Sequence, residues 1–161
     1  MKSRRDVVTR LVALGLFYPL FACGNGDNKK GLFVKGKAVL DVVLFNYRNR
    51  AIFDVLLNGD DIGVAGPWGG GGGVMTGVTI PLGVQTLSWR LGGPRGMAGN
   101  GDTITVTNAL TLAADQISPN DRYLGVHIYS DDTAELTLSQ YLPEMTPKGE
   151  RIYKEGHLHG K

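Results

Sequence analysis

Hydrophobic and polar residues alternate with a period of two along much of the chain, the spacing of a β-strand with one buried face. The clearest case is 84–91, where Leu87, Trp89 and Leu91 fall on one side. Similar runs, rich in β-branched and aromatic residues, lie at 37–47, 51–57, 74–81, 102–112, 122–130 and 134–140. About seven short strands with turn residues between them predict an all-β fold, an antiparallel two-sheet sandwich of immunoglobulin-like size.

The segments between these runs indicate which strands are neighbours. The runs 37–47 and 51–57 are expected to form one hairpin, and 74–81 and 84–91 a second pair. The polar residues at 130–133 form a turn that joins the last two strands.

The first 22 residues follow a different pattern. Four basic residues stand among the first ten, and the run 11–21 is then almost wholly apolar, as in a secretory signal peptide. This run is too short to span a bilayer. Leu20, Phe21 and Ala22 precede the chain's one cysteine, Cys23. These four residues resemble a bacterial lipobox, which implies that Cys23 is lipidated and that the chain is cut before it. The alternative is a buried N-terminal helix with a packed cysteine.

Four segments follow from this interpretation. Residues 1–22 are the lipoprotein signal peptide, 23–31 a lipidated tether, 32–144 the β-sandwich domain, and 145–161 a poorly ordered tail. Gly24 stands where an Asp would resemble an inner-membrane retention signal, so we expect anchoring in the outer membrane, facing the periplasm.

Charge and cysteine content narrow the function further. The chain has 17 Lys and Arg against 15 Asp and Glu. Cleavage before Cys23 removes four basic residues and one acidic residue, which leaves 13 against 14. The mature domain therefore has no basic excess, and no basic stripe interleaved with aromatics predicts nucleic-acid binding. One cysteine allows no disulfide within the chain.

The sequence gives little evidence for a catalytic or cofactor-binding site. The glycine run at 66–73 lacks the Lys-Ser/Thr ending of a phosphate-binding loop, and is predicted to be a loop that packs closely or contacts a partner. His127 lies on the polar face of its strand without a marked nucleophile, and His157 and His159 lie in the tail. No zinc or calcium motif is present. We therefore expect no enzyme activity, no cofactor and no metal.

Several segments in one order resemble a family of small bacterial lipoproteins with a domain of unknown function. The segments are "FNYRNRAIFDVLLNG" at 45–59, the glycine run with "VTIP" at 78–81, "TLSWRL" at 86–91, and "LGVHIYSDDTAELTLSQYLPE" at 124–144. This family often has a cysteine pair after the glycine run, where this chain has Val74 and Met75.

The resemblance implies an immunity protein. Members of such families occur beside type VI secretion effectors, including lipases and phospholipases, so the expected partner is a lipase-type toxin that this lipoprotein binds and blocks. Asp60, Asp61, Trp68 and Arg95 lie in loops or turns and are the predicted contact residues. Two acidic pairs, Asp60-Asp61 and Asp131-Asp132, lie in turns, and their alternative roles are those of ordinary turn residues or of calcium ligands. The alternatives are an accessory envelope lipoprotein of a secretion system and a binder of small ligands at the glycine run.

Overall fold

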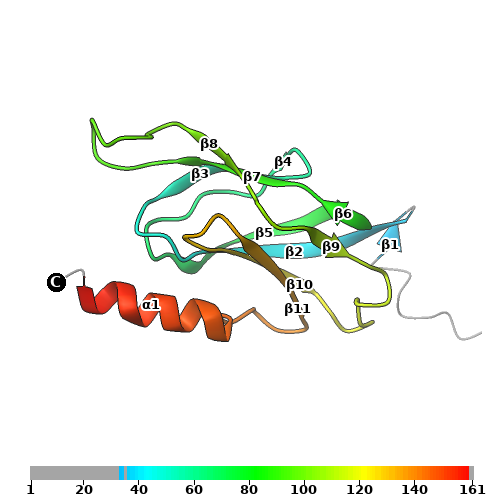
Figure 1. Ribbon diagram of the computed structural model, residues 1–161. Helices are drawn as coiled ribbons and strands as arrows, with labels where there is room; N and C mark the ends of the chain where they lie inside the picture. Colours follow the sequence, from blue (N-terminus) through cyan, green and yellow to red (C-terminus); the bar gives the residue numbers. More distant parts are fainter. Residues whose placement is uncertain (1–32, 35, 160–161) are drawn as a thin grey trace, which may run out of the picture.

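The computed structural model describes residues 33–34 and 36–159, and it confirms the all-β sandwich (Figure 1). The predicted signal peptide, lipobox and tether, with Cys23, lie outside the described residues. The elements in chain order are β1 (Phe33–Val34), β2 (Lys37–Asn46), β3 (Ile52–Leu57), β4 (Asp60–Asp61), β5 (Gly70–Pro81), β6 (Gly83–Gln85), β7 (Leu87–Leu91), β8 (Thr103–Thr105), β9 (Leu110–Leu112), β10 (Tyr123–Ile128), β11 (Ala134–Ser139) and α1 (Pro147–His159).

The described residues form three sheets. Sheet A contains β1, β2, β5, β10 and β11; sheet B contains β4, β3, β7 and β8; and β6 and β9 form a small third sheet. β5 pairs antiparallel with one side of β2, and β10 lies on the other side. The β2–β10 pair is parallel, with Val42 opposite Leu124, so one central pair departs from the expected antiparallel arrangement.

Strand β2 is buried on both faces, and its two sets of side chains belong to different cores. Leu40, Val42 and Leu44 face sheet B and pack with Trp89 and the other residues of the main core. Val43 and Phe45 face the opposite way, into a second core beneath α1. Because successive side chains of a strand point to opposite faces, this one strand joins the two layers.

Helix α1 covers the outer face of sheet A (Figure 1). Thr146 caps its N-terminus, since the Thr146 Oγ1 accepts a hydrogen bond from the Gly149 N–H at 3.0 Å. Pro147 occupies the first helical position, where a missing N–H costs nothing. The prediction of a poorly ordered tail at 145–161 is therefore wrong for Pro147–His159, because this segment has a cap and a surface to pack against.

The two strand pairs predicted from chain order are also wrong. β2 and β3 lie in different sheets, because the chain crosses from sheet A to sheet B between them. β5 likewise pairs with β2, whereas β7 pairs with β3 and β8. The predicted run 102–112 divides into β8 and β9, which belong to different sheets. The hairpin of β10 and β11 is confirmed.

Replacing Thr146 with alanine is expected to destabilise the protein by about 2 kcal/mol. The change removes the helix cap, which contributes about 1 kcal/mol, and a 2.7 Å hydrogen bond between Thr146 Oγ1 and the buried Tyr129 hydroxyl. Urea unfolding followed by circular dichroism measures the loss. Thr146→Ser keeps the oxygen and should recover most of the stability; equal losses in both variants would show that the hydroxyl is not the stabilising group.

Candidate functional site

An apolar groove opens between the start of β5 and the segment that precedes it, and it reaches the core residues Leu44 and Ile62. Its volume is about 560 Å³, and its walls are formed by Leu44, residues 62–66, Gly69, Gly70 and residues 73–75. Val64 is 71% exposed at this groove, Val74 44% and Met75 41%. Large apolar side chains that are exposed together, rather than singly, indicate a binding surface.

Buried Asn46 fixes the wall of the groove. Its side-chain amide donates to the carbonyl oxygens of Arg50 at 2.7 Å and Gly66 at 2.8 Å. Its backbone N–H donates to the Gly69 carbonyl oxygen. Ala65 forms two backbone hydrogen bonds with Ile52 at the start of β3. The wall is therefore tied to both sheets and is a preformed surface.

The predicted glycine loop is partly a strand, because β5 begins at Gly70. Gly70 lies against Phe45, and a Cβ at Gly70 would approach the Phe45 Cδ1 and the Met145 Cε to 3.2 Å. A Cβ at Gly73, by contrast, would meet no atom within 4 Å. The run thus combines one glycine required for packing with another that leaves the groove open.

The four predicted contact residues do not form one site. Asp60 and Asp61 form the exposed strand β4, and an Asp61 carboxylate oxygen accepts a 2.8 Å hydrogen bond from the Gly63 N–H at the end of the groove. Trp68 is half-buried, and its ring lies where a Cβ of Gly156 in α1 would be 2.6 Å away. Arg95 is exposed on the loop 92–102 and does not line the groove.

His127 lies in the second core and not, as predicted, on a solvated face. It is fully buried and stacks on Phe45 with ring centroids 4.4 Å apart. Its Nδ1 is 2.9 Å from the Tyr47 hydroxyl, and its Nε2 is 2.9 Å from the Thr137 Oγ1. Burial lowers the pKa of His127 to about 4 and raises the pKa of Tyr47 to about 12. Because both ring nitrogens are hydrogen-bonded and the side chain has no exposed surface, this imidazole has a structural role in the second core.

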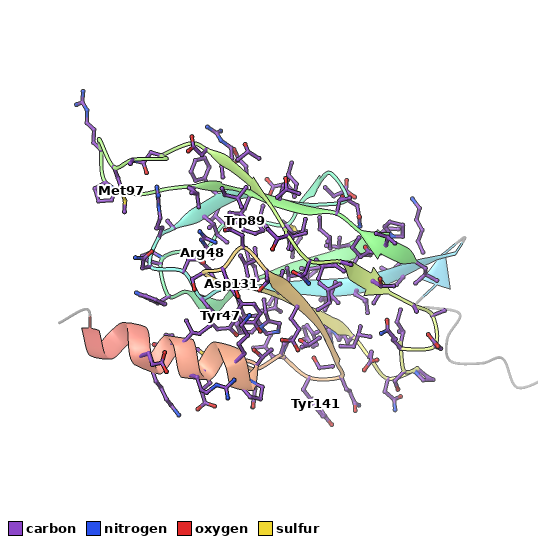
Figure 2. The ribbon with its side chains drawn as sticks, viewed as in Figure 1. Tyr47, Arg48, Trp89, Met97, Asp131 and Tyr141 are labelled. Carbon is purple, nitrogen blue, oxygen red and sulfur yellow. The ribbon has the colours of Figure 1, made fainter. Side chains whose placement is uncertain are left out.

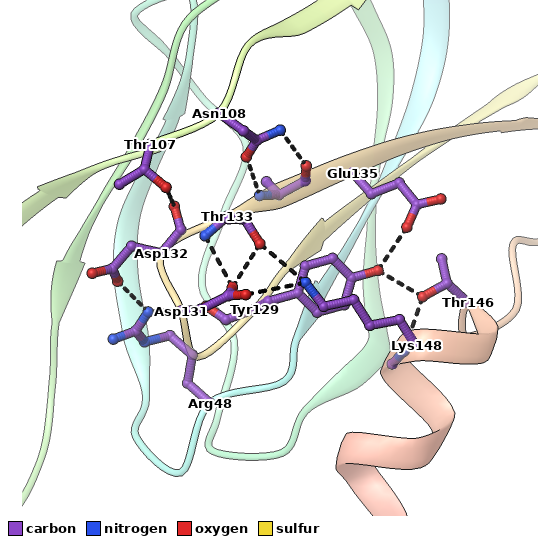
Figure 3. A network of polar contacts seen from close by, with 12 residues as sticks. Arg48, Thr107, Asn108, Tyr129, Asp131, Asp132, Thr133, Glu135, Thr146 and Lys148 are labelled. Atoms are coloured by element: carbon purple, nitrogen blue, oxygen red, sulfur yellow. Dashed lines mark hydrogen bonds and ion pairs between the residues drawn. The ribbon is translucent and has the colours of Figure 1, made fainter.

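A polar network ties the β10–β11 turn to its neighbours (Figure 3). Arg48 donates to the Tyr129 carbonyl oxygen at 3.0 Å and forms an ion pair with Asp132. Lys148, in the first turn of α1, lies 3.2 Å from an Asp131 carboxylate oxygen. Figure 2 shows Arg48 and Asp131 close together, between the interior residue Trp89 and the helix. These contacts give the two carboxylates of the acidic turn at 131–132 basic partners, Lys148 for Asp131 and Arg48 for Asp132.

Sequence reasoning missed most of the groove. Val74 and Met75 were assigned only to the predicted strand 74–81 and Val64 to no site, and the wall is held by Asn46, which joins segments 20 residues apart. The available signal was an apolar residue on each side of a glycine run, which does not by itself distinguish core from surface.

Within 33–34 and 36–159, no group of three or more His, Cys, Asp or Glu residues is placed to hold a metal ion. None of the helical structure described in this part of the chain is long and apolar enough to cross a bilayer.

A scan against protein-family models, a search of curated proteins and a search of solved structures found no match to this chain.

Proposed function

We propose that this chain is a lipid-anchored immunity protein that faces the periplasm from the outer membrane. It binds a lipase-type toxin delivered by a type VI secretion system and neutralises it. The observation that carries the proposal is the groove beside β5, a preformed surface with exposed apolar side chains and an exposed acidic pair at its end. The proposed location of the protein comes from the lipobox-like sequence, and the proposed class of toxin comes from the family resemblance.

An anchor suits this role physically. A toxin that attacks phospholipid works at the membrane surface, and a lipidated inhibitor is concentrated at that surface. Anchoring raises the local concentration of the inhibitor around the toxin without any new contact. Two or more acyl chains hold a protein stably at a bilayer, whereas one chain holds it only marginally.

The test is protection in cells. The full chain is expressed in a sensitive host together with the candidate lipase toxin encoded beside it, and the toxin is routed to the periplasm. The proposal expects survival that depends on this chain and a complex that co-purifies with it. Continued killing despite good expression of both proteins would contradict the proposal and favour an accessory envelope lipoprotein.

Replacing Cys23 with serine is expected to abolish membrane anchoring. Serine offers no thiol for lipid attachment, so incorporation of labelled palmitate should fall to background. Membrane fractionation should lose the chain from the outer-membrane fraction. Asp27→Asn, in the predicted tether, is the matched control and should leave labelling unchanged. Equal labelling of Cys23→Ser and the unaltered chain would place the lipid elsewhere and refute the lipobox interpretation.

A further inference from the structure

Strand β5 is an open edge of sheet A. It pairs with β2 on one side, and none of the strands within 33–34 and 36–159 pairs with its other side. An open strand edge presents unpaired N–H and C=O groups to any extended chain that approaches it. The groove lies along this strand at Gly70, Gly73, Val74 and Met75.

The opposite edge of sheet A is closed at its start. The Asn108 side chain accepts a 2.8 Å hydrogen bond from the Ala134 N–H and donates a 3.0 Å bond to the Ala134 carbonyl oxygen, so it occupies both groups of β11 there (Figure 3). The Thr107 N–H donates to the Asp132 carbonyl oxygen just before this strand. The fold thus caps the start of β11, whereas no hydrogen bond of this kind is made to the outer side of β5 among the described residues.

β5 has few of the features that normally prevent an edge strand from pairing with another chain. Edge strands are commonly protected by lysine, proline, bulges or charges. β5 has no charged residue, and its proline is the last residue, Pro81. Its pairing with β2 contains two register shifts, which are the one feature of this kind within β5.

Charge decides what kind of chain fits this edge. Asp61 lies at the groove end that Gly63 forms, and among the described residues neither its carboxylate nor that of its neighbour Asp60 has an ion-pair partner. A second copy of β5 could not neutralise them, because β5 carries no Lys or Arg. A strand with a basic residue at one end could do so, while its alternate apolar side chains enter the groove.

We propose that the open edge of β5 binds an extended segment of the partner protein as an added strand. The added strand places apolar side chains against Val64 and Val74, and a Lys or Arg against Asp61. In this mode main-chain hydrogen bonds supply affinity, and the pockets for alternate side chains supply specificity. The identity of the partner as a toxin rests on the proposed function above, whereas the mode of binding rests on this edge alone.

The experiment uses the full chain, purified in detergent, and a displayed library of random 12-residue peptides as the probe. Selected peptides should alternate apolar and polar residues and carry Lys or Arg near one end. Their binding should slow hydrogen exchange in residues 70–77. Val74→Lys, which charges the groove, should weaken binding at least tenfold, and so should Gly73→Leu, which fills it where a Cβ meets no neighbour.

Val84→Lys is the matched control, because Val84 is 77% exposed and does not line the groove. It should change affinity less than twofold, and circular dichroism should show all three variants folded. A library without binders that protect 70–77 would overturn the proposal. So would equal binding by Val74→Lys and the unaltered chain, or self-association that Val74→Lys abolishes.

The two proposals can fail separately. If the chain protects cells from the toxin and Val74→Lys protects equally well, strand addition at β5 is wrong and the immunity function stands. If peptides bind the β5 edge but no toxin is neutralised, the edge site stands and the immunity function is wrong.

Discussion

Replacing Gly149 with alanine is expected to destabilise the protein by about 3 kcal/mol, although alanine is the better helix former. A Cβ at Gly149 would lie 2.1 Å from the Cζ of Tyr47. Tyr47 is buried, stacks between His127 and Tyr129, and bonds to the His127 Nδ1. Figure 2 shows it between the sheet and α1. Because this ring cannot move aside, the helix must rise from the sheet, and overpacking of this kind costs about 1–3 kcal/mol or more.

Gly156→Ala is the matched control, seven residues further along the same helix. Its Cβ would approach the Trp68 ring at 2.6 Å, but Trp68 is half-buried and can turn toward solvent. Both substitutions gain about 1 kcal/mol in helix propensity, so the difference between them compares a contact with the fixed Tyr47 ring with a contact with the movable Trp68 ring. We expect Gly156→Ala to change stability by less than 1 kcal/mol.

Urea unfolding measures both variants. In a Tyr47→Ala background, Gly149→Ala should no longer be destabilising, which is the signature of a direct contact in a double-mutant cycle. A Gly149→Ala protein as stable as the unaltered chain would show that the helix does not pack on Tyr47.

Lowering the pH from 7.5 to 4.5 is expected to cost about 2–3 kcal/mol of stability through His127. Its pKa is near 6.5 in an unfolded chain, and burial lowers it to about 4 in the folded protein. The folded state therefore holds a neutral imidazole at pH values where the unfolded chain binds a proton. The stabilisation is complete above pH 6.5, falls as the pH drops toward 4, and changes little below that.

Urea midpoints measured at half-unit pH steps test this window. His127→Gln keeps a polar group near the Tyr47 hydroxyl but does not titrate, so it should flatten the curve between pH 6.5 and 4.5. The lowered pKa values of Asp131, through its hydrogen bond with Thr133, and of exposed Glu150, through Lys154, act at lower pH and remain in both proteins. Identical slopes for the two proteins would show that another group carries the pH dependence.

The inward faces of the strands were predictable from the sequence, because a half-buried strand has a period of two. Leu87 and Trp89 were expected on one face, and both are fully buried. The pairing of strands was not predictable in the same way. Turn residues show where a strand ends, but not whether the chain returns to the same sheet, and here β2 and β3 separate because Asn46 and its partners turn the chain toward sheet B.

The second core could not be predicted from the sequence for a related reason. His127 and Tyr129 alternate with apolar residues, as polar residues on a wet face do. Their burial depends on α1, whose two glycines made 147–159 a poor helix candidate. The same glycines allow the helix to approach the Tyr47 and Trp68 rings. The cap at Thr146 followed by Pro147 was the local signal that could have revealed the helix.

The parallel pairing of β2 with β10 also governs when this protein can fold. The two strands are about 80 residues apart in the sequence, yet they are the centre of sheet A. Closing so long a loop has a large entropic cost before any contact offsets it, so folding dominated by such pairs is slow. Sheet A cannot be completed until the last third of the chain is available, although β5 can pair with β2 earlier. Under the proposed export, a chain that crosses the membrane as it emerges therefore does so with one side of β2 unpaired, and it completes its fold only after β10 has followed.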